Sequence, residues 1–196
     1  TIALFIDDQV RITQDLFEAF ADLVEANVSE FLTRRQRSAA AKQRRSAEVV
    51  EELSKPGTKI LAVFNTSRQD ARPADHVAGF IAWRNDVQEE GFLKCIAYTL
   101  YLHLTPLFRD NKIGKTLIAY AEDDALESSE AGAVTMLLTV LKKNKRAQGF
   151  YKHLDYDPSA TSPDDGDYIV SCPRFCAPAR RNLLLLTIGR SILDRS

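Results

Sequence analysis

The stretch with the clearest chemical potential is residues 109–116, which read Arg-Asp-Asn-Lys-Ile-Gly-Lys-Thr between a predicted strand and a predicted helix. The first N–H groups of a helix have no partner within it and lie at the positive end of its dipole, so such a turn can bind an anion, usually a phosphate. Gly114 allows close approach of the backbone, and Arg109, Lys112 and Lys115 add positive charge. The stretch is neither a Walker A loop nor a GxGxxG turn, so an ordinary turn with surface lysines is an equally good interpretation.

A second candidate group lies on a predicted helix at residues 144–154, which follows a buried strand. Asn144 is suited to cap this helix. Ala147, Phe150 and Tyr151 follow it at offsets of three, six and seven, which place them on one helical face. The group is either a capped helix that packs its aromatic side or a site that uses a tyrosine hydroxyl.

The elements that must position these residues follow from apolar spacing and from breakers. Helices are predicted at 13–31, with Thr13 as N-cap, around 49–53, at 113–127 and at 144–154. In the first helix the repeating face is apolar except for Asn27. Strands are predicted at 59–64, 76–83, 92–105, 134–141 and 168–170. Helices, antiparallel strands and then a strand–helix–strand–helix order indicate an α+β fold with one parallel crossover.

The composition describes one ordinary globular domain. Of 196 residues, 45% are apolar and 27% are charged, which excludes wholesale disorder and leaves room for a core. No apolar run approaches the ~18–20 residues that span a bilayer, and residues 1–10 do not resemble a secretory signal. The 26 basic and 27 acidic residues give a net charge of -1, which argues against a strongly basic nucleic-acid binder.

The three cysteines indicate no metal site. Cys95, Cys172 and Cys176 cannot all pair within the chain, and the last two lack the spacing of a structural zinc site. We therefore expect reduced thiols in a cytoplasmic or nuclear protein, without a bound metal.

Charge is segregated along the chain although the total nearly cancels. Basic residues gather at 34–45 and 109–115, and aspartates gather at 155–167. A solvent-exposed helix side is expected at Glu122, Asp123, Asp124, Glu127 and Glu130. The tail 172–196 contains five arginines and an apolar group at 183–186, and no role is assigned to it.

Together, the two candidate groups resemble the motifs of the GCN5-related N-acetyltransferase (GNAT) superfamily. That superfamily carries (Q/R)-x-x-G-x-(G/A) after its fourth strand; Arg109 and Gly114 match it, and Lys112 stands at its first glycine. It carries N-x-x-A-x-x-(F/L)-Y on the helix after its fifth strand, which is matched in full by Asn144, Ala147, Phe150 and Tyr151. The resemblance implies an α+β GNAT fold with a mixed, mostly antiparallel sheet flanked by helices. It also implies that acetyl-coenzyme A binds between two splayed strands, at Leu102, His103, Leu104, Arg109, Asp110, Asn111, Lys112, Ile113, Gly114, Lys115, Thr116 and Asn144.

A closer resemblance is to the histone-selective N-alpha-acetyltransferase D family. The family's L-T-V-x-K-x-N-x-x-A is similar to residues 138–147, and its R-x-D-V is similar to residues 84–87. Its fourth strand is similar to residues 98–104, and its C-terminal motifs are similar to residues 156–163 and 167–171. The resemblance implies a GNAT domain at 1–171 and a C-terminal extension at 172–196.

The same resemblance implies the acceptor of the acetyl group. Substrates of this family are basic tails that begin Ser-Gly-Arg-Gly, namely those of histones four and two-A, and they are acetylated on the N-terminal amine. The acceptor residues carried over are Phe31, Asp86, Tyr98, Thr139, Asp165 and Tyr168. Carboxylates at a cleft mouth would pair with the arginine of the tail, whereas a solvated acidic loop is an equal interpretation. We expect a monomer in the cytoplasm and nucleus that contacts neither nucleic acid nor membrane.

Departures from the family pattern bear on catalysis. Tyr101 stands where the family has a glutamate near the attacking amine, and Leu100 replaces the preceding tyrosine. An α-amino group has a pKa near ~8, so part of it is already neutral, and a relay through water by Tyr101 or His103 would suffice. Tyr151 is at the position that protonates the coenzyme A thiolate. We expect an N-acetyltransferase; a GNAT enzyme for another amine and a non-catalytic GNAT-fold binding protein are the alternatives.

Overall fold

The computed structural model of the chain describes residues 2–7, 12–65, 73–86, 96–128, 135–159, 162 and 166–173. Its centre is a seven-stranded sheet in the order β1-β2-β3-β4-β5-β7-β6. The strands are β1 (Ile2–Asp7), β2 (Thr58–Asn65), β3 (Val77–Asp86), β4 (Ile96–Leu104), β5 (Thr135–Leu141), β6 (Tyr156–Pro158) and β7 (Tyr168–Pro173). Described neighbours are antiparallel apart from the parallel pair of β4 and β5. The predicted mixed, mostly antiparallel sheet with one parallel crossover is confirmed.

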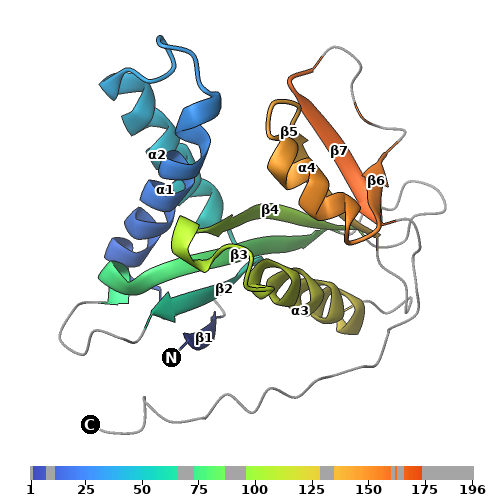
Figure 1. The fold of residues 1–196 in the computed structure, drawn as a ribbon. Helices are drawn as coiled ribbons and strands as arrows, with labels where there is room; N and C mark the ends of the chain where they lie inside the picture. Colours follow the sequence, from blue (N-terminus) through green and yellow to red (C-terminus); the bar gives the residue numbers. More distant parts are fainter. Residues whose placement is uncertain are drawn as a thin grey trace, which may run out of the picture.

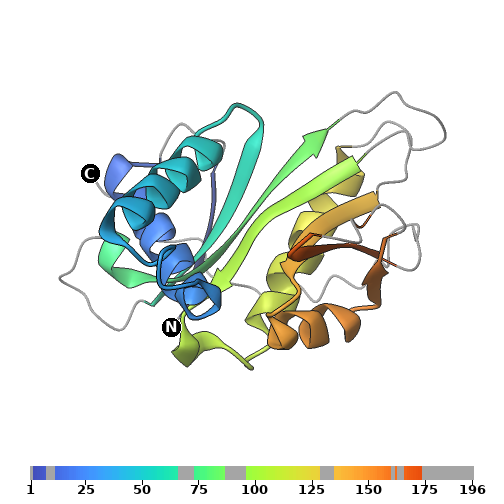
Figure 2. The ribbon, with the colours of Figure 1, turned by 90° about the horizontal axis from the view of Figure 1, so that it is seen from above.

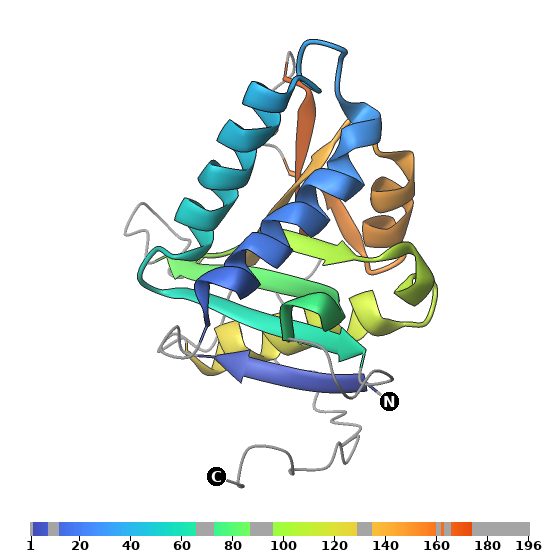
Figure 3. The same ribbon diagram turned by 90° about the vertical axis from the view of Figure 1, so that its left-hand side faces the viewer.

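Helices cover both faces of this sheet (Figure 1). One face carries α1 (Gln14–Val28) and α2 (Ala39–Leu53), and the other carries α3 (Ile113–Glu127) and α4 (Lys145–Lys152). Figure 3 shows α1 and α2 side by side across the strands. Single 3-10 turns lie at η1 (Ser29–Phe31), η2 (Pro73–His76) and η3 (Pro106–Phe108). Within the described ranges, every helix is too short or too polar to cross a bilayer.

The first core lies between the sheet and the pair α1 and α2. The apolar face of α1 is buried there, as its helical spacing predicts. Phe20 is fully buried, and its ring centroid lies 4.5 Å from that of Phe80 in β3. Thr13 occupies the predicted N-cap position, although its side chain makes no capping hydrogen bond. This packing fixes α1 against the sheet face that also carries the side chains of Leu100 and Tyr101.

A partly buried ion pair joins α1 to α2. Arg45 donates from Nη2 to Oε1 of Glu25 at 2.6 Å and from Nε to Oε2 at 3.0 Å. It also donates from Nη1 to the backbone carbonyl of Gln36 at 2.5 Å, in the loop between the helices. One charge of the basic stretch 34–45 is therefore neutralised within the fold.

The second core lies between the sheet and the pair α3 and α4. Trp83 is buried there, and its indole N–H donates to Oδ2 of Asp124 at 2.9 Å, which also accepts from Lys59 at 2.7 Å. Oε1 of Glu122 accepts from the hydroxyl of Tyr156 at 2.5 Å, and burial raises the pKa of Glu122. The expectation that Glu122 and Asp124 face solvent is wrong, because the buried indole and phenol each need an acceptor.

The sheet contains two strands that the spacing does not predict. β1 pairs antiparallel along β2, from Ile2 with Asn65 to Asp7 with Ile60. β6 has three residues, too few to show an alternating pattern, and it pairs with β7. The predicted strand 168–170 is the first half of β7, which continues to residue 173. Of the aspartates at 155–167, Asp157 therefore lies in a strand and not in a loop.

Candidate active site

A cleft opens where β4 and β5 separate. Their parallel pairing joins residues 96–99 to 135–138 and ends there. Beyond this point β4 stays paired with β3, and β5 stays paired with β7 (Figure 2). The gap is a cavity of about 140 Å³, lined by Val28, Thr99, Leu100, Tyr101, Leu102, His103, Leu138, Thr139, Val140, Leu141, Asn144, Ala147 and Tyr151.

β4 carries a β-bulge at the start of this cleft. Thr99 and Tyr101 pair with neighbouring residues of β3, so Leu100 between them has no opposite residue. The bulge reverses the alternation of side chains, since Ala97 packs in the core under α3 whereas Tyr101 packs on the core of α1 and α2. Tyr101 and His103 therefore stand together on the α1 side, with ring centroids 6.2 Å apart.

A half-buried polar network surrounds His103. The side-chain nitrogen of Asn27 lies 3.3 Å from Nδ1 of His103 and donates to the carbonyl of Leu104 at 3.1 Å. Arg109 donates from Nη2 to Oδ1 of Asn27 at 2.6 Å and from Nε to the same carbonyl at 3.2 Å. Burial and the charge of Arg109 lower the pKa of His103 to about 4, so its imidazole is neutral at physiological pH. The Arg109 guanidinium thus turns toward α1.

Residues 109–116 form the expected turn from strand to helix. Asp110 and Lys112 have φ of 63° and 61°, in the left-handed region. The carboxylate of Asp110 accepts from Arg146 at 2.6 Å, which ties the turn to α4. A Cβ on Gly114 would lie 3.2 Å from Cζ of Phe150, so a glycine lets α3 approach α4. The turn presents the first N–H groups of α3, which have no partner within the helix.

Two hydroxyl groups at the cleft have no partner among the described residues. Asn144 Oδ1 accepts from the N–H of Ala147 at 3.0 Å, which confirms the predicted cap and fixes the start of the helix that carries Tyr151. The Tyr151 hydroxyl has no hydrogen-bond partner among the described residues, and burial raises its pKa, so it stays protonated at physiological pH. Thr99, where the strands part, has a buried hydroxyl with no partner in the described part of the chain.

The family-level comparison covers every residue that lines this cleft. The model of the acetyltransferase (GNAT) family matches residues 22–156, more than half of the chain. The chain belongs to the acetyltransferase (GNAT) family. A comparison with curated proteins finds no match.

Solved structures show the same GNAT fold. The PaiA N-acetyltransferase of Thermoplasma acidophilum in complex with coenzyme A is 19% identical, with a TM-score of 0.57 over 88% of this chain and 99% of that chain. The NatC complex bound to Gag peptide and coenzyme A is 16% identical, with a TM-score of 0.57 over 88% and 97%. Aminoglycoside 6'-acetyltransferase type Ii is 21% identical, with a TM-score of 0.60 over 91% and 99%.

The cleft of this GNAT protein fits acetyl-coenzyme A. Beyond Thr99 and Leu138 the backbones of β4 and β5 no longer pair with each other, so polar groups at this edge can bond to a ligand instead. Residues 110–116 present helix N–H groups for the phosphates. When bound, acetyl-coenzyme A supplies the acetyl group as a thioester. No group of three or more metal-ligating side chains occurs among the described residues.

The structure brings some of the predicted site residues of this GNAT protein into the cleft and leaves others outside it. Those that line the cleft are Tyr101, Leu102, His103, Thr139, Asn144 and Tyr151. Leu104 packs against the α3 core, and Tyr98 is half-buried in β4. Phe31 is half-buried at the end of η1, and Tyr168 is exposed on β7 next to Leu141. Asp165, the Asp86 side chain, Glu130, Cys95 and Cys176 lie outside the described residues.

Three contributors to the site escape the sequence motifs. Asn27, the Thr99 hydroxyl and the bulge at Leu100 all belong to the cleft region of this GNAT protein. Asn27 leaves a trace in the sequence, because it is the one polar residue on an otherwise apolar helical face. The bulge leaves none, since its position depends on how β4 pairs with β3 and not on a residue type in β4.

Replacing Lys112 by glycine is expected to stabilise the protein by about 1 kcal/mol. Lys112 has a φ of 61° just before α3, and a Cβ is disfavoured in that conformation. The family motif has a glycine here, and the conformation that suits glycine is retained with a lysine in its place. Urea denaturation of Lys112→Gly beside Lys115→Gly tests this, because Lys115 lies inside the helix, where glycine costs about 1 kcal/mol. Equal effects of the two variants would contradict it.

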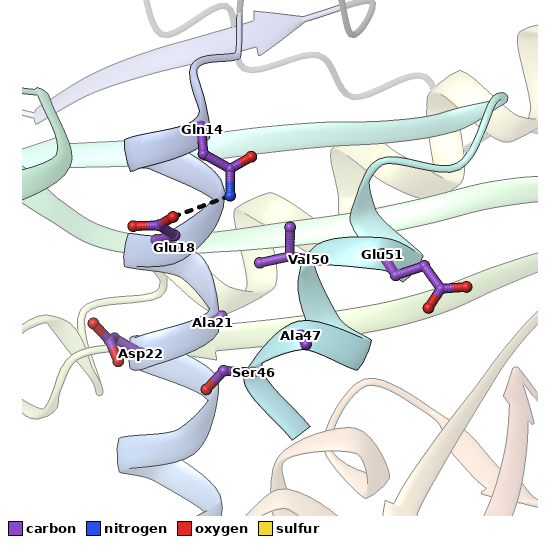
Figure 4. A pocket seen from close by; sticks show the side chains of 8 residues that line it. All are labelled: Gln14, Glu18, Ala21, Asp22, Ser46, Ala47, Val50 and Glu51. Atoms are coloured by element: carbon purple, nitrogen blue, oxygen red, sulfur yellow. Dashed lines mark hydrogen bonds between the residues drawn. The ribbon is translucent and has the colours of Figure 1, made fainter. Parts of the chain in front are cut away.

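A larger groove lies between α1 and α2, away from the cleft. It has a volume of about 510 Å³ and is lined by Gln14, Glu18, Ala21, Asp22, Ser46, Ala47, Val50 and Glu51 (Figure 4). Gln14 donates to Glu18 at 3.0 Å, and the groove shares no residue with the cleft. Its lining contains no residue of the turn 109–116 and none of the residues at the separation of β4 and β5. The smaller cleft is therefore the candidate active site.

Proposed function

We propose that this GNAT-family protein transfers the acetyl group of acetyl-coenzyme A to the N-terminal amine of a basic protein tail. The proposed acceptors begin Ser-Gly-Arg-Gly, as do histones four and two-A, and the protein acts as a monomer in the cytoplasm and nucleus. The observation that carries the proposal is the open end of β4 and β5, with the free hydroxyl of Tyr151 on one wall and Tyr101 on the other.

Carboxylates of α2 lie near Tyr101 on one side of the cleft. Burial raises the pKa of Tyr101, and the carboxylates of Glu52 and Glu48 on α2 raise it further. Glu52 is held by Arg84 at 3.0 Å and by Lys55 at 2.5 Å. Glu52 and its two partners therefore carry no net negative charge, and the support for a cationic acceptor comes from β6 and β7.

The strand pair β6 and β7 supports a cationic acceptor. The carbonyl of Asp167 accepts from the N–H of Lys142 at 2.8 Å, directly after the cleft residue Leu141. Its carboxylate is exposed, and the neighbouring Tyr168 is 44% exposed. A carboxylate and an aromatic ring at this end of β5 suit an arginine side chain of a tail.

Acetyl transfer to an α-amine requires little from the protein beyond positioning of the two reactants. An α-amine has a pKa near ~8, so a neutral nucleophile is available at physiological pH. Tyr101 is a protonated phenol there, so it can orient the amine or a water but cannot take a proton directly. Tyr151 is protonated and can donate to the sulfur that leaves.

A second candidate function follows from Tyr101 itself. Tyr101 is a protonated phenol, and a pKa of about 4 makes His103 a weak base, which suits a GNAT-fold protein that binds acetyl-coenzyme A or a tail without turnover. A GNAT enzyme for another amine is the further alternative.

The test compares two peptides in steady-state acetylation, one beginning Ser-Gly-Arg-Gly and one beginning Ser-Gly-Asp-Gly. We expect kcat/KM to be higher for the first by about 10-fold or more, because one charge-assisted pair contributes about 1.5 kcal/mol or more. Equal rates contradict a basic-tail substrate.

Thermal denaturation with acetyl-coenzyme A separates the remaining outcomes. A ligand at 100 times its dissociation constant stabilises a protein by about 2.7 kcal/mol. Stabilisation without acetylation of either peptide contradicts the basic-tail substrate and leaves the non-catalytic protein and the enzyme for another amine. If the protein shows no stabilisation and no acetylation, the proposed function is contradicted as a whole.

A further inference from the structure

We infer that Asn27 is a positioning residue: it holds His103 as the neutral tautomer with its proton on Nε2, so that His103 offers the cleft a hydrogen-bond donor and not a base. Asn27 belongs to α1 and His103 to β4, so the contact bridges a helix and the strand that forms one wall of the cleft. Its catalytic consequence rests on the proposed function, while the tautomer itself does not.

The direction of the Asn27 amide is fixed by two neighbours. Arg109 has only donors, so the atom 2.6 Å from its Nη2 must be the amide oxygen. The carbonyl of Leu104 can only accept, so the atom 3.1 Å from it must be the amide nitrogen. A flipped amide would place donor against donor and acceptor against acceptor.

The amide direction then decides the histidine tautomer. The group that faces Nδ1 of His103 at 3.3 Å is the Asn27 amino group, which has no acceptor capacity. Nδ1 must accept this hydrogen bond, so in a neutral ring the proton sits on Nε2. Nε2 has no partner among the described residues, and His103 lines the cleft.

The surroundings keep His103 neutral. The Phe80 ring lies beside the imidazole at a centroid distance of 6.1 Å. The Tyr101 ring, two residues earlier in β4, lies at a centroid distance of 6.2 Å. The charged group that faces it is the Arg109 guanidinium, which opposes a second positive charge. Together with burial, this lowers the pKa of His103 to about 4. A donor at Nε2 is therefore present throughout the physiological pH range.

The test is the nitrogen chemical shifts of the histidine side chains in the full-length, 15N-labelled protein. The chain has three histidines, so comparison with His103→Gln assigns the His103 signals. We expect wild-type His103 to show a protonated Nε2 and an unprotonated Nδ1 from pH 5.5 to 8.5. A proton on Nδ1, or a titration near the ordinary value of about 6.5, overturns the inference without any variant.

Asn27→Asp is the decisive variant, since it keeps the shape and the bond to Arg109 but can only accept from His103. The neutral tautomer should switch to Nδ1–H, and the pKa of His103 should rise because a carboxylate lies beside it. Acetylation by this variant should then fall about 10-fold as the pH rises through that pKa, because the neutral ring no longer donates from Nε2. An unchanged tautomer in a folded variant overturns the inference.

Gln14→Glu is the matched control, an amide-to-carboxylate change on the same helix at an exposed position. It should leave the His103 signals unchanged, and a shift of equal size would assign the effect to net charge. The nitrogen spectra need no turnover. An inactive protein with the Nε2–H tautomer therefore contradicts the proposed function alone, and an active protein with Nδ1–H contradicts this inference alone.

Discussion

Tyr151→Phe is expected to lower kcat by about 100-fold, while the affinity for acetyl-coenzyme A stays within about twofold. The Tyr151 hydroxyl lines the cleft from α4, has no partner among the described residues and stays protonated because burial raises its pKa. Loss of the hydroxyl leaves the ring and its packing against Phe150 and Tyr156 in place. The variant therefore removes a proton donor and little else, and pre-steady-state acetylation measures the effect.

Tyr120→Phe is the control for Tyr151→Phe. Tyr120 lies on α3, is 38% exposed and packs edge-on against Trp83, away from the cleft. Its change should leave kcat unaltered. If Tyr151→Phe retains the wild-type kcat, Tyr151 only packs, and the sulfur takes its proton from another group or from water.

Glu25→Ala is expected to destabilise the protein by about 3 kcal/mol. Both oxygens of Glu25 bond to Arg45, and the Glu25 side chain is only 11% exposed. Without the carboxylate, the guanidinium stays between α1 and α2 with its Gln36 carbonyl but without a counter-charge. Urea denaturation measures the loss, and the midpoint should fall with little change in slope.

Two variants test the physical origin of the Glu25 effect. Glu48→Ala breaks an exposed pair with Arg44 on α2, at 3.9 Å, and should cost at most about 0.5 kcal/mol. The double variant Glu25→Leu with Arg45→Met removes both charges and should recover most of the stability. A double variant as unstable as Glu25→Ala would show that lost packing is responsible.

Elements marked by breakers could be predicted closely from the sequence. The helix predicted at 113–127 coincides with α3, and the cap at Asn144 is as expected. These features are local, since a turn, an apolar stripe and one capping side chain decide them. The family's motifs lie in the same local segments, which is why the GNAT fold could be inferred from them.

The missed features depend on contacts between distant segments. Asp124 accepts from Trp83, 41 positions away, and Asn27 meets His103, 76 positions away. A helical aspartate is usually solvated, so nothing in the sequence distinguishes the one that serves a buried indole. The bulge at Leu100 is decided by the pairing of β4 with β3, which joins segments that are distant in the sequence.

The separation of β4 from β5 also has a consequence for the folded state itself. Over residues 100–104 and 139–141 the sheet lacks one line of ladder hydrogen bonds, although each strand keeps its outer neighbour. An extended ligand between these strands would take the place of a missing strand, with amide groups of its own as rungs. The sheet is in this sense completed by a small molecule, so backbone amides on both strands should exchange with solvent more slowly once it is bound.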